Sequence, residues 1–143
     1  MGYGIELASK IKKENKYIME SNNFQTIFNI ISDYLPKKWD KVAMYFLCSG
    51  NMFISKFYVD MGNGFVDCYN LGYQRPVLGR IFRSLEAVLI KERTELPPKN
   101  VWSVFTMLVD SNGKFEADYE YEDVSETFIE HQKKWEEKHI KKR

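Results

Sequence analysis

The spacing of hydrophobic positions along this 143-residue chain predicts helices in four places. From Phe24 to Leu35 the large apolar residues recur at helical spacing, and Pro36 then ends the pattern. A wide apolar stripe follows Pro76, a residue that favours the first turn of a helix. Two segments of weaker amphipathicity lie near the ends of the chain. The predicted helices cover residues 5–20, 24–35, 76–89 and 125–142.

Shorter apolar runs between these helices predict strands. Residues 39–48 are apolar on both alternating sets of positions, which is typical of a central strand that is covered on both faces. Turns that contain glycine and asparagine separate this run from predicted strands at residues 52–60 and 65–70. Two more strands are predicted within residues 101–123.

The order of these elements predicts the fold class. Strands joined by short turns favour an antiparallel meander, and the helices are expected to pack on it. The chain is therefore predicted to form one α+β domain over residues 1–143, with a sheet of about five strands, N-terminal helices and a C-terminal helix. Residues 1–22 are expected to be a helical extension of that domain.

The last two strands are predicted to form a hairpin closed by a two-residue type I′ turn at Asn112-Gly113, because this dipeptide tolerates the positive φ that both central residues need. Counting outward from such a turn places Met107 opposite Asp118. The next pair on that face is Phe105 with Glu120. One face of the hairpin then mixes carboxylates with large apolar side chains, and the other is apolar like a core. We expect the mixed face to contact a basic protein partner.

Positive and negative residues are segregated along the chain, although the net charge is close to zero. The formal net charge is +1, which indicates neither a nucleic-acid binder nor a polyanion. Lysines gather at both ends, whereas every charge between Glu116 and Glu126 is negative. Such segregation bears on partners and association rates rather than on the fold. The acids of this segment are Glu116, Asp118, Glu120, Glu122, Asp123 and Glu126.

The sequence contains no arrangement of residues that is typical of an enzyme. A hydrolase needs a nucleophile beside a positioned base, but the two histidines, His131 and His139, fall on the charged terminal helix. There is no G-x-S-x-G, C-x-x-C or H-E-x-x-H motif and no Rossmann or Walker pattern. Alternate carboxylates on a strand lie about 7 Å apart and do not surround a metal ion by themselves. We therefore predict a protein that has no catalytic activity and binds no cofactor or metal ion. The alternative is a small enzyme that uses His131 or His139.

The cysteines and the apolar runs indicate a cytoplasmic protein. Cys48 and Cys68 both lie in apolar, strand-like segments without a metal-binding pair, so we expect buried thiols in a reducing compartment. No segment has the length of a membrane span or the pattern of a secretory signal. Acids interrupt the basic terminal helix, which argues against direct nucleic-acid binding. A small nucleic-acid-binding or adaptor module remains the alternative function.

Several segments together resemble one family of proteins. The clearest string is SNGKFEADYEYED, which follows Val101-Trp102 and is similar to a family hairpin of the form Trp…DGKF…DYxYDD. The helix that ends at Pro36, the aromatic strand with Tyr45-Phe46 and the terminal helix with Trp135 fit the same pattern. Over residues 24–140 the chain thus resembles the YezG-like immunity proteins, antitoxins that neutralise bacterial nuclease toxins used in competition between cells.

This resemblance implies a non-enzymatic inhibitor in the cytoplasm of the producing cell and its siblings, for example in contact-dependent growth inhibition. Its partner would be a cognate toxin domain, a DNase or RNase, blocked at its active site or at its substrate-binding face. A nuclease offers a cationic surface to phosphates, and carboxylates along a strand can imitate the phosphate pattern. We therefore predict toxin binding by the acidic strand, with two apolar anchors that lose water on contact. The predicted carboxylates are Glu116, Asp118, Glu120, Glu122 and Asp123, and the predicted anchors are Phe105 and Met107.

Overall fold

The computed structural model describes residues 21–141, and every structural statement below refers to this part of the chain. The helix predicted over residues 5–20, and with it most of the predicted extension, lies outside the described residues. Helices and strands follow one another in an order that confirms the α+β class. The elements are α1 (Ser21–Ser32), β1 (Lys41–Ser49), β2 (Met52–Asp60), β3 (Phe65–Asp67), η1 (Cys68–Asn70), α2 (Arg75–Thr94), η2 (Pro98–Asn100), β4 (Val104–Asp110), β5 (Phe115–Glu120) and α3 (Phe128–His139), where η marks a short 3-10 helix.

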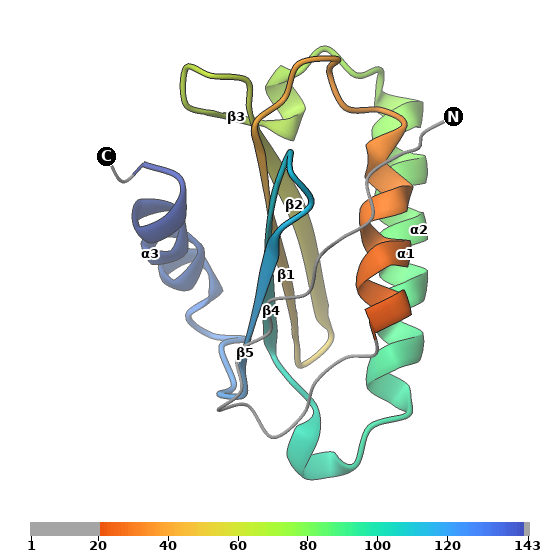
Figure 1. Cartoon of the computed structure of the whole chain (residues 1–143). Coiled ribbons are helices and arrows are strands. Elements are labelled where there is room, and N and C mark those ends of the chain that lie inside the picture. The colour runs from red at the N-terminus through yellow and green to blue at the C-terminus, as the bar shows by residue number, and fades with distance from the viewer. Residues whose placement is uncertain (1–20, 142–143) are drawn as a thin grey trace.

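All strands of the described sheet pair antiparallel, in the order β3-β2-β1-β4-β5 (Figure 1). The first three strands form a meander, and α2 then carries the chain from the β3 edge to the far side of β1, where β4 and β5 form a hairpin. β1 is therefore the central strand, as its two apolar sets of positions predicted, and residues 42–47 are all buried. β3 is shorter than predicted, because the side chain of Asp67 accepts a hydrogen bond from the backbone of Tyr69 and begins η1.

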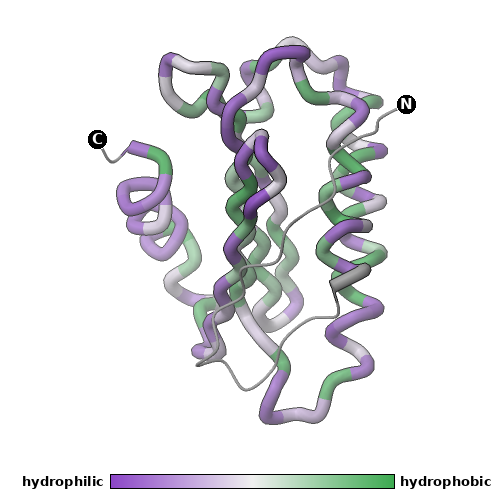
Figure 2. The backbone as a smooth tube through the Cα atoms, in the orientation of Figure 1, coloured by the Kyte–Doolittle hydropathy of each residue, from purple (hydrophilic) through white to green (hydrophobic). Residues whose placement is uncertain are grey.

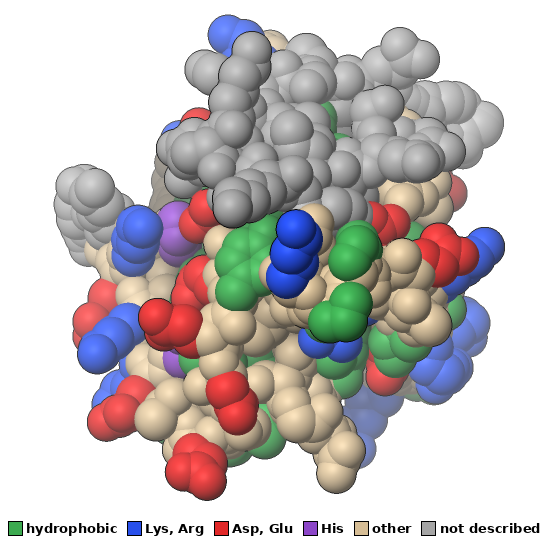
Figure 3. Space-filling view, turned by 90° about the horizontal axis from the view of Figure 1, so that it is seen from below, with side chains coloured by type: hydrophobic (Ala, Val, Ile, Leu, Met, Phe, Trp, Pro, Cys, Tyr) green, Lys and Arg blue, Asp and Glu red, His purple; other side chains and the backbone are tan. Residues whose placement is uncertain are grey.

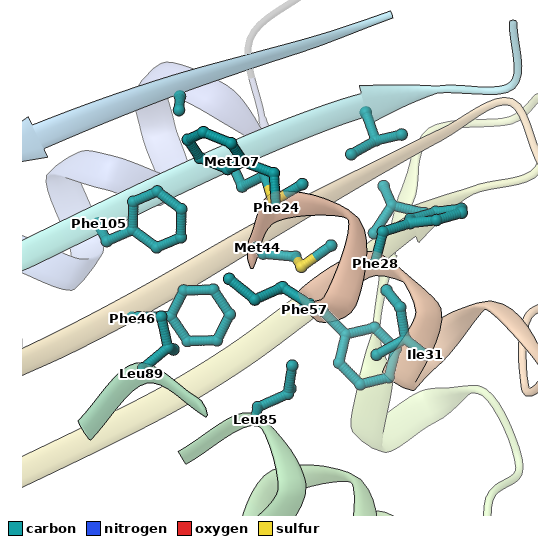
Figure 4. Packing of buried hydrophobic residues seen from close by; sticks show 14 of the residues in the cluster. Phe24, Phe28, Ile31, Met44, Phe46, Phe57, Leu85, Leu89, Phe105 and Met107 are labelled. Carbon is teal, nitrogen blue, oxygen red and sulfur yellow. The ribbon is translucent and has the colours of Figure 1, made fainter. Parts of the chain in front are cut away.

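Helices cover both faces of the sheet. α1 and α2 lie side by side on one face, named here the inner face, and α3 lies on the opposite, outer face (Figure 1). Each face has its own hydrophobic cluster. None of the described helices combines the length and the apolar character that crossing a bilayer requires. The side chains labelled in Figure 4, all from the inner cluster, are Phe24, Phe28, Ile31, Met44, Phe46, Phe57, Leu85, Leu89, Phe105 and Met107.

α3 is held on the outer face largely by one buried tryptophan. Trp135 packs against the rings of Tyr45 and Tyr58, whose centroids lie 4.8 and 5.6 Å from its own. Its Nε1 donates to Thr106 Oγ1 at 2.9 Å, so the buried indole N–H is satisfied. Figure 2 shows that α3 is otherwise mostly hydrophilic. The helix therefore depends on a narrow apolar stripe for docking, which agrees with the weak amphipathicity of its sequence.

The β4–β5 hairpin has a different turn from the predicted one. The backbone N–H of Asp110 donates to the carbonyl oxygen of Lys114 at 2.9 Å, so the loop has three residues, Ser111, Asn112 and Gly113. In this loop only Gly113 takes a positive φ, of +89°. The loop is stabilised by Asp110 Oδ1, which accepts from the backbone N–H groups of Asn112 and Lys114 at 2.9 and 3.1 Å. The prediction of a two-residue type I′ turn is therefore wrong.

The extra loop residue shifts the register of the hairpin by one position. Phe105 pairs with Tyr119 and Met107 with Ala117, not with acidic residues. A shift of one position moves every side chain of a strand to the opposite face. Phe105 and Met107, both 0% exposed, consequently lie in the inner core with the apolar side chains of β5. Their prediction as anchors on a mixed surface is wrong, because a partner cannot reach them.

Candidate functional site

The five carboxylates predicted to bind a toxin stay together in the structure, and they are named here the acidic ribbon. Glu116, Asp118 and Glu120 alternate along the outer face of β5, and Glu122 and Asp123 follow in the connection to α3. Glu116, Glu122 and Asp123 are exposed, whereas Asp118 and Glu120 are half-buried. The ribbon is thus at the surface as predicted, but its neighbour is α3 rather than an apolar face of the hairpin.

Glu120 is joined to the central strand through a histidine. His131 of α3 lies between the two, with Nε2 2.8 Å from Glu120 Oε1 and Nδ1 2.9 Å from the Tyr45 hydroxyl oxygen. Burial raises the pKa of Tyr45 well above its usual value, and the charges of Glu120 and Glu136 raise it further. The phenol therefore keeps its proton, and the imidazole bridges the Tyr45 hydroxyl and the Glu120 carboxylate. One imidazole thus fastens α3 to both β1 and β5.

The contacts of the two histidines are those of residues that hold the fold together. Both ring nitrogens of His131 have partners, and its ring stacks on Tyr45 with 5.9 Å between centroids and 30° between planes. A general base needs a nitrogen within reach of the proton that it removes. His139 packs against Trp135, with 5.0 Å between ring centroids. Within residues 21–141 no group of histidine, cysteine and acidic residues could hold a metal ion.

A second set of hydrogen bonds fixes the connection between β5 and α3. Asp123 Oδ1 accepts from Ser49 Oγ at 2.8 Å, and from the hydroxyl and backbone N–H of Ser125 at 2.7 and 3.0 Å. These bonds, that from the Ser125 backbone above all, hold the pKa of Asp123 below its usual value. Ser49 Oγ also accepts from the backbone of Val124, a buried residue of the outer cluster. The last helix was predicted to begin at Ser125, but Ser125 belongs to this turn and α3 begins only at Phe128.

Glu116 and Asp118 border a hollow beside the end of α3. They line a cavity of about 270 Å³ together with Leu108 and His139. A second cavity of about 310 Å³ shares Glu116, Leu108 and His139 and lies nearer the hairpin loop. Lysines stand among the carboxylates around both cavities. This hollow therefore offers less net negative charge than the connection between β5 and α3.

The sequence does not predict an ion-pair cluster that lies between α3 and β2. Lys56 Nζ is 2.7 Å from Asp67 Oδ2 and 3.7 Å from Glu136 Oε2, and the Tyr58 hydroxyl donates to Glu136 at 2.5 Å. Burial lowers the pKa of Lys56, but the hydrogen bond and charge of Asp67, with the charge of Glu136, outweigh it and raise the pKa overall. Because these residues are far apart in the chain, no local pattern could reveal the cluster.

Two large apolar side chains are exposed in the same part of the chain as the acidic ribbon. Tyr121, directly after β5, is 43% exposed, and Ile129, at the start of α3, is 65% exposed. In Figure 3, acidic side chains gather on the side of the molecule where α3 lies. Sequence reasoning missed both residues. Ile129 follows Phe128 in a segment that is otherwise polar, and Tyr121 falls on the face of the predicted hairpin that is apolar like a core. Residues 115–132 contain no lysine or arginine but seven acids, Glu116, Asp118, Glu120, Glu122, Asp123, Glu126 and Glu130.

The chain is similar to proteins that have been described as immunity proteins. The family model described as "Immunity protein YezG-like" matches residues 21–143, which include the acidic ribbon and α3. Immunity protein YezG of Bacillus subtilis (strain 168) is 25% identical over 109 residues, which are 71% of this chain and 72% of that protein. Immunity protein YezG of Bacillus spizizenii is 28% identical over 109 residues, which are 71% of this chain and 68% of that protein.

Proposed function

Since this chain belongs to the YezG-like immunity proteins, we propose that it protects its cell by binding a nuclease toxin through the acidic ribbon. The match over residues 21–143 confirms the family predicted from the sequence, and with it the role of an immunity protein that has a cognate toxin as partner. In this proposal the two proteins meet in the cytoplasm. Contact between neighbouring cells delivers the toxin, as in contact-dependent growth inhibition.

The observation that carries the choice of a nuclease is the unbroken negative charge of residues 115–132. A nuclease must attract the phosphates of its substrate, so its substrate-binding surface is positive. Carboxylates along a strand and the following turn are complementary to that surface, and complementary charge raises the association rate and disfavours wrong partners. A toxin surface covered in this way excludes its nucleic acid without any chemical step by the inhibitor.

The members of the acidic ribbon have two different tasks in this proposal. Glu120 and Asp123 already accept hydrogen bonds within the fold, so they position the surface. Glu116 and Glu122 are exposed and are available to pair with basic side chains of the toxin. Exposed ion pairs contribute little one at a time. We therefore expect the ribbon to act collectively, and mainly on the rate at which the two proteins associate.

Charge reversal on the acidic ribbon tests this function. The cognate toxin domain is identified by its effect, because it stops the growth of cells that lack this chain and spares cells that produce it. The variant with Glu116→Lys and Glu122→Lys is expected to associate with the purified domain at least about tenfold more slowly at low salt, with a smaller effect at high salt. The matched control combines Asp33→Lys and Glu95→Lys, which change exposed acids beside α1 and α2. Its association rate in surface plasmon resonance should equal that of the unchanged chain.

Each outcome bears on a different part of the proposal. Equal association rates for the two double variants would remove the acidic ribbon from the interface and leave the role of an immunity protein in place. A cognate toxin that degrades neither DNA nor RNA would contradict the proposed target class. Direct binding of this chain to DNA or RNA, with a steep dependence on salt, would favour a nucleic-acid-binding module instead.

A further inference from the structure

Ile129 is the most exposed large hydrophobic side chain of the described residues, at 65% exposure. A single exposed apolar side chain on a protein surface needs no explanation by itself. The position of Ile129 sets it apart, because it is the second residue of α3 and directly follows the most acidic part of the chain. Protein interfaces place apolar side chains at the centre of a polar rim.

α3 directs Ile129 away from its own fold. Phe128, His131 and Trp135 form the side of the helix that packs on the outer face of the sheet. An α-helix turns by about 100° per residue, so a residue two positions before His131 lies nearly opposite to it. The side chain of Ile129 therefore projects into solvent.

The frame that carries Ile129 is fixed before any partner arrives. His131, half a turn further along α3, is hydrogen-bonded to both β1 and β5. The turn that precedes the helix is tied to the end of β1 through Asp123 and Ser49. An anchor that is already held in place loses less conformational entropy on binding than a mobile one. Ile129 thus differs from an apolar residue on a loose loop.

We propose that Ile129 is the central apolar anchor of the interface with the cognate toxin, which receives it in an apolar pocket bordered by basic side chains. The basic border follows from charge complementarity, because Glu122, Glu126 and Glu130 are exposed and residues 115–132 contain no lysine or arginine. Interfaces concentrate binding energy in a few desolvated side chains within a polar rim. This inference rests on the proposed function, since the toxin domain is the occupant of the surface.

Truncation of Ile129 beside a matched control tests the anchor. Ile129→Ala is expected to weaken the binding of the full chain to the purified toxin domain at least about tenfold in Kd, mainly through faster dissociation. The control is Ile90→Ala, because Ile90 is another exposed isoleucine on a helix, at 43% exposure, but lies on α2 on the other side of the sheet. Its Kd should stay within about twofold of the unchanged chain. Both variants should keep their melting temperature, because exposed positions contribute little to stability.

A series at the same position separates contact from charge. Ile129→Met should retain binding, whereas Ile129→Lys should bind more weakly than Ile129→Ala, because it adds a charge of the same sign as the basic border of the toxin pocket. An unchanged Kd for Ile129→Ala or for Ile129→Lys would overturn the anchor and leave the immunity function intact. If the unchanged chain does not bind the toxin domain, the proposed function fails and the anchor fails with it. The two surfaces are distinguishable, since the acidic ribbon controls association and the anchor controls dissociation.

Discussion

Replacement of Phe105 by alanine tests the register of the β4–β5 hairpin, on which the position of every carboxylate in β5 depends. Phe105 is 0% exposed. Its ring centroid lies 5.6 Å from that of Phe46, 5.2 Å from that of Tyr119 and 5.7 Å from that of Trp102. Under the two-residue turn predicted from the sequence, the same ring would lie at the surface. The two registers therefore predict very different effects on stability.

The structure sets the magnitude of the expected loss. Removal of a buried phenylalanine ring costs about 3–5 kcal/mol, which combines its transfer from water with the cavity that it leaves. The close aromatic neighbours place Phe105→Ala near the upper end of this range, because each ring pair contributes about 0.5–1.5 kcal/mol beyond its buried area. We expect the free energy of unfolding to fall by about 4–5 kcal/mol and the melting temperature by roughly 10–15 °C.

Urea unfolding followed by tryptophan fluorescence and circular dichroism measures this loss. The comparison holds if the slope of the free energy against urea concentration stays the same, since a changed slope indicates a changed unfolded or native state. Ile90→Ala serves as the control and should change the free energy of unfolding by less than about 0.5 kcal/mol. If Phe105→Ala lost less than about 1 kcal/mol and also weakened toxin binding, the side chain would lie at the surface and the observed register would be refuted.

Two further predictions concern ionisable groups. The folded pKa of Asp123 is below its usual 3.8, so its hydrogen bonds stabilise the fold above that pH, and this contribution is lost as the pH falls through the folded pKa. In urea unfolding at a series of pH values, Asp123→Asn should lose less stability than the unchanged chain between about pH 4 and pH 2, and identical pH profiles would contradict this. Burial raises the pKa of Cys68 to about 12. At about pH 8 its thiol should react with iodoacetamide far more slowly in the folded chain than in urea, as followed by mass spectrometry, and rapid modification of the folded chain would count against its burial.

The sequence predicts the parts of the fold that depend on local patterns. The strand expected over residues 52–60 is observed as Met52–Asp60, and the two apolar sets of β1 identify it as central. The hairpin loop is less well determined, because Asn112-Gly113 suits both a two-residue turn and a three-residue loop with glycine in the left-handed region. The side-chain hydrogen bonds of Asp110 favour the longer loop. One residue of loop length then decides whether Phe105 lies in the core.

The acids of the candidate site could be predicted, but their partners within the fold could not. An acidic segment next to a turn lies at the surface in either register, so the acidic ribbon is found where expected. Its hydrogen bonds depend on the path of α3 across the sheet, which contacts between distant residues determine. The helical spacing of Phe128, His131 and Trp135 is a signal that could have identified the docking side of α3. Ile129 becomes visible only once the packed side of the helix is known.

The central place of β1 has a consequence for the time at which the protein begins to work. Its partner β4 comes roughly 60 to 70 residues later in the chain. During synthesis β1 therefore leaves the ribosome long before β4 does, and the edge of β1 that pairs with β4 stays unpaired in the meantime. Pairing across such a separation also folds more slowly than pairing between neighbouring strands. The inner core, to which Phe105 and Met107 of β4 contribute, closes only after that strand has emerged. Protection of a cell that is exposed to the toxin therefore depends on completed molecules, and not on chains that are still being translated.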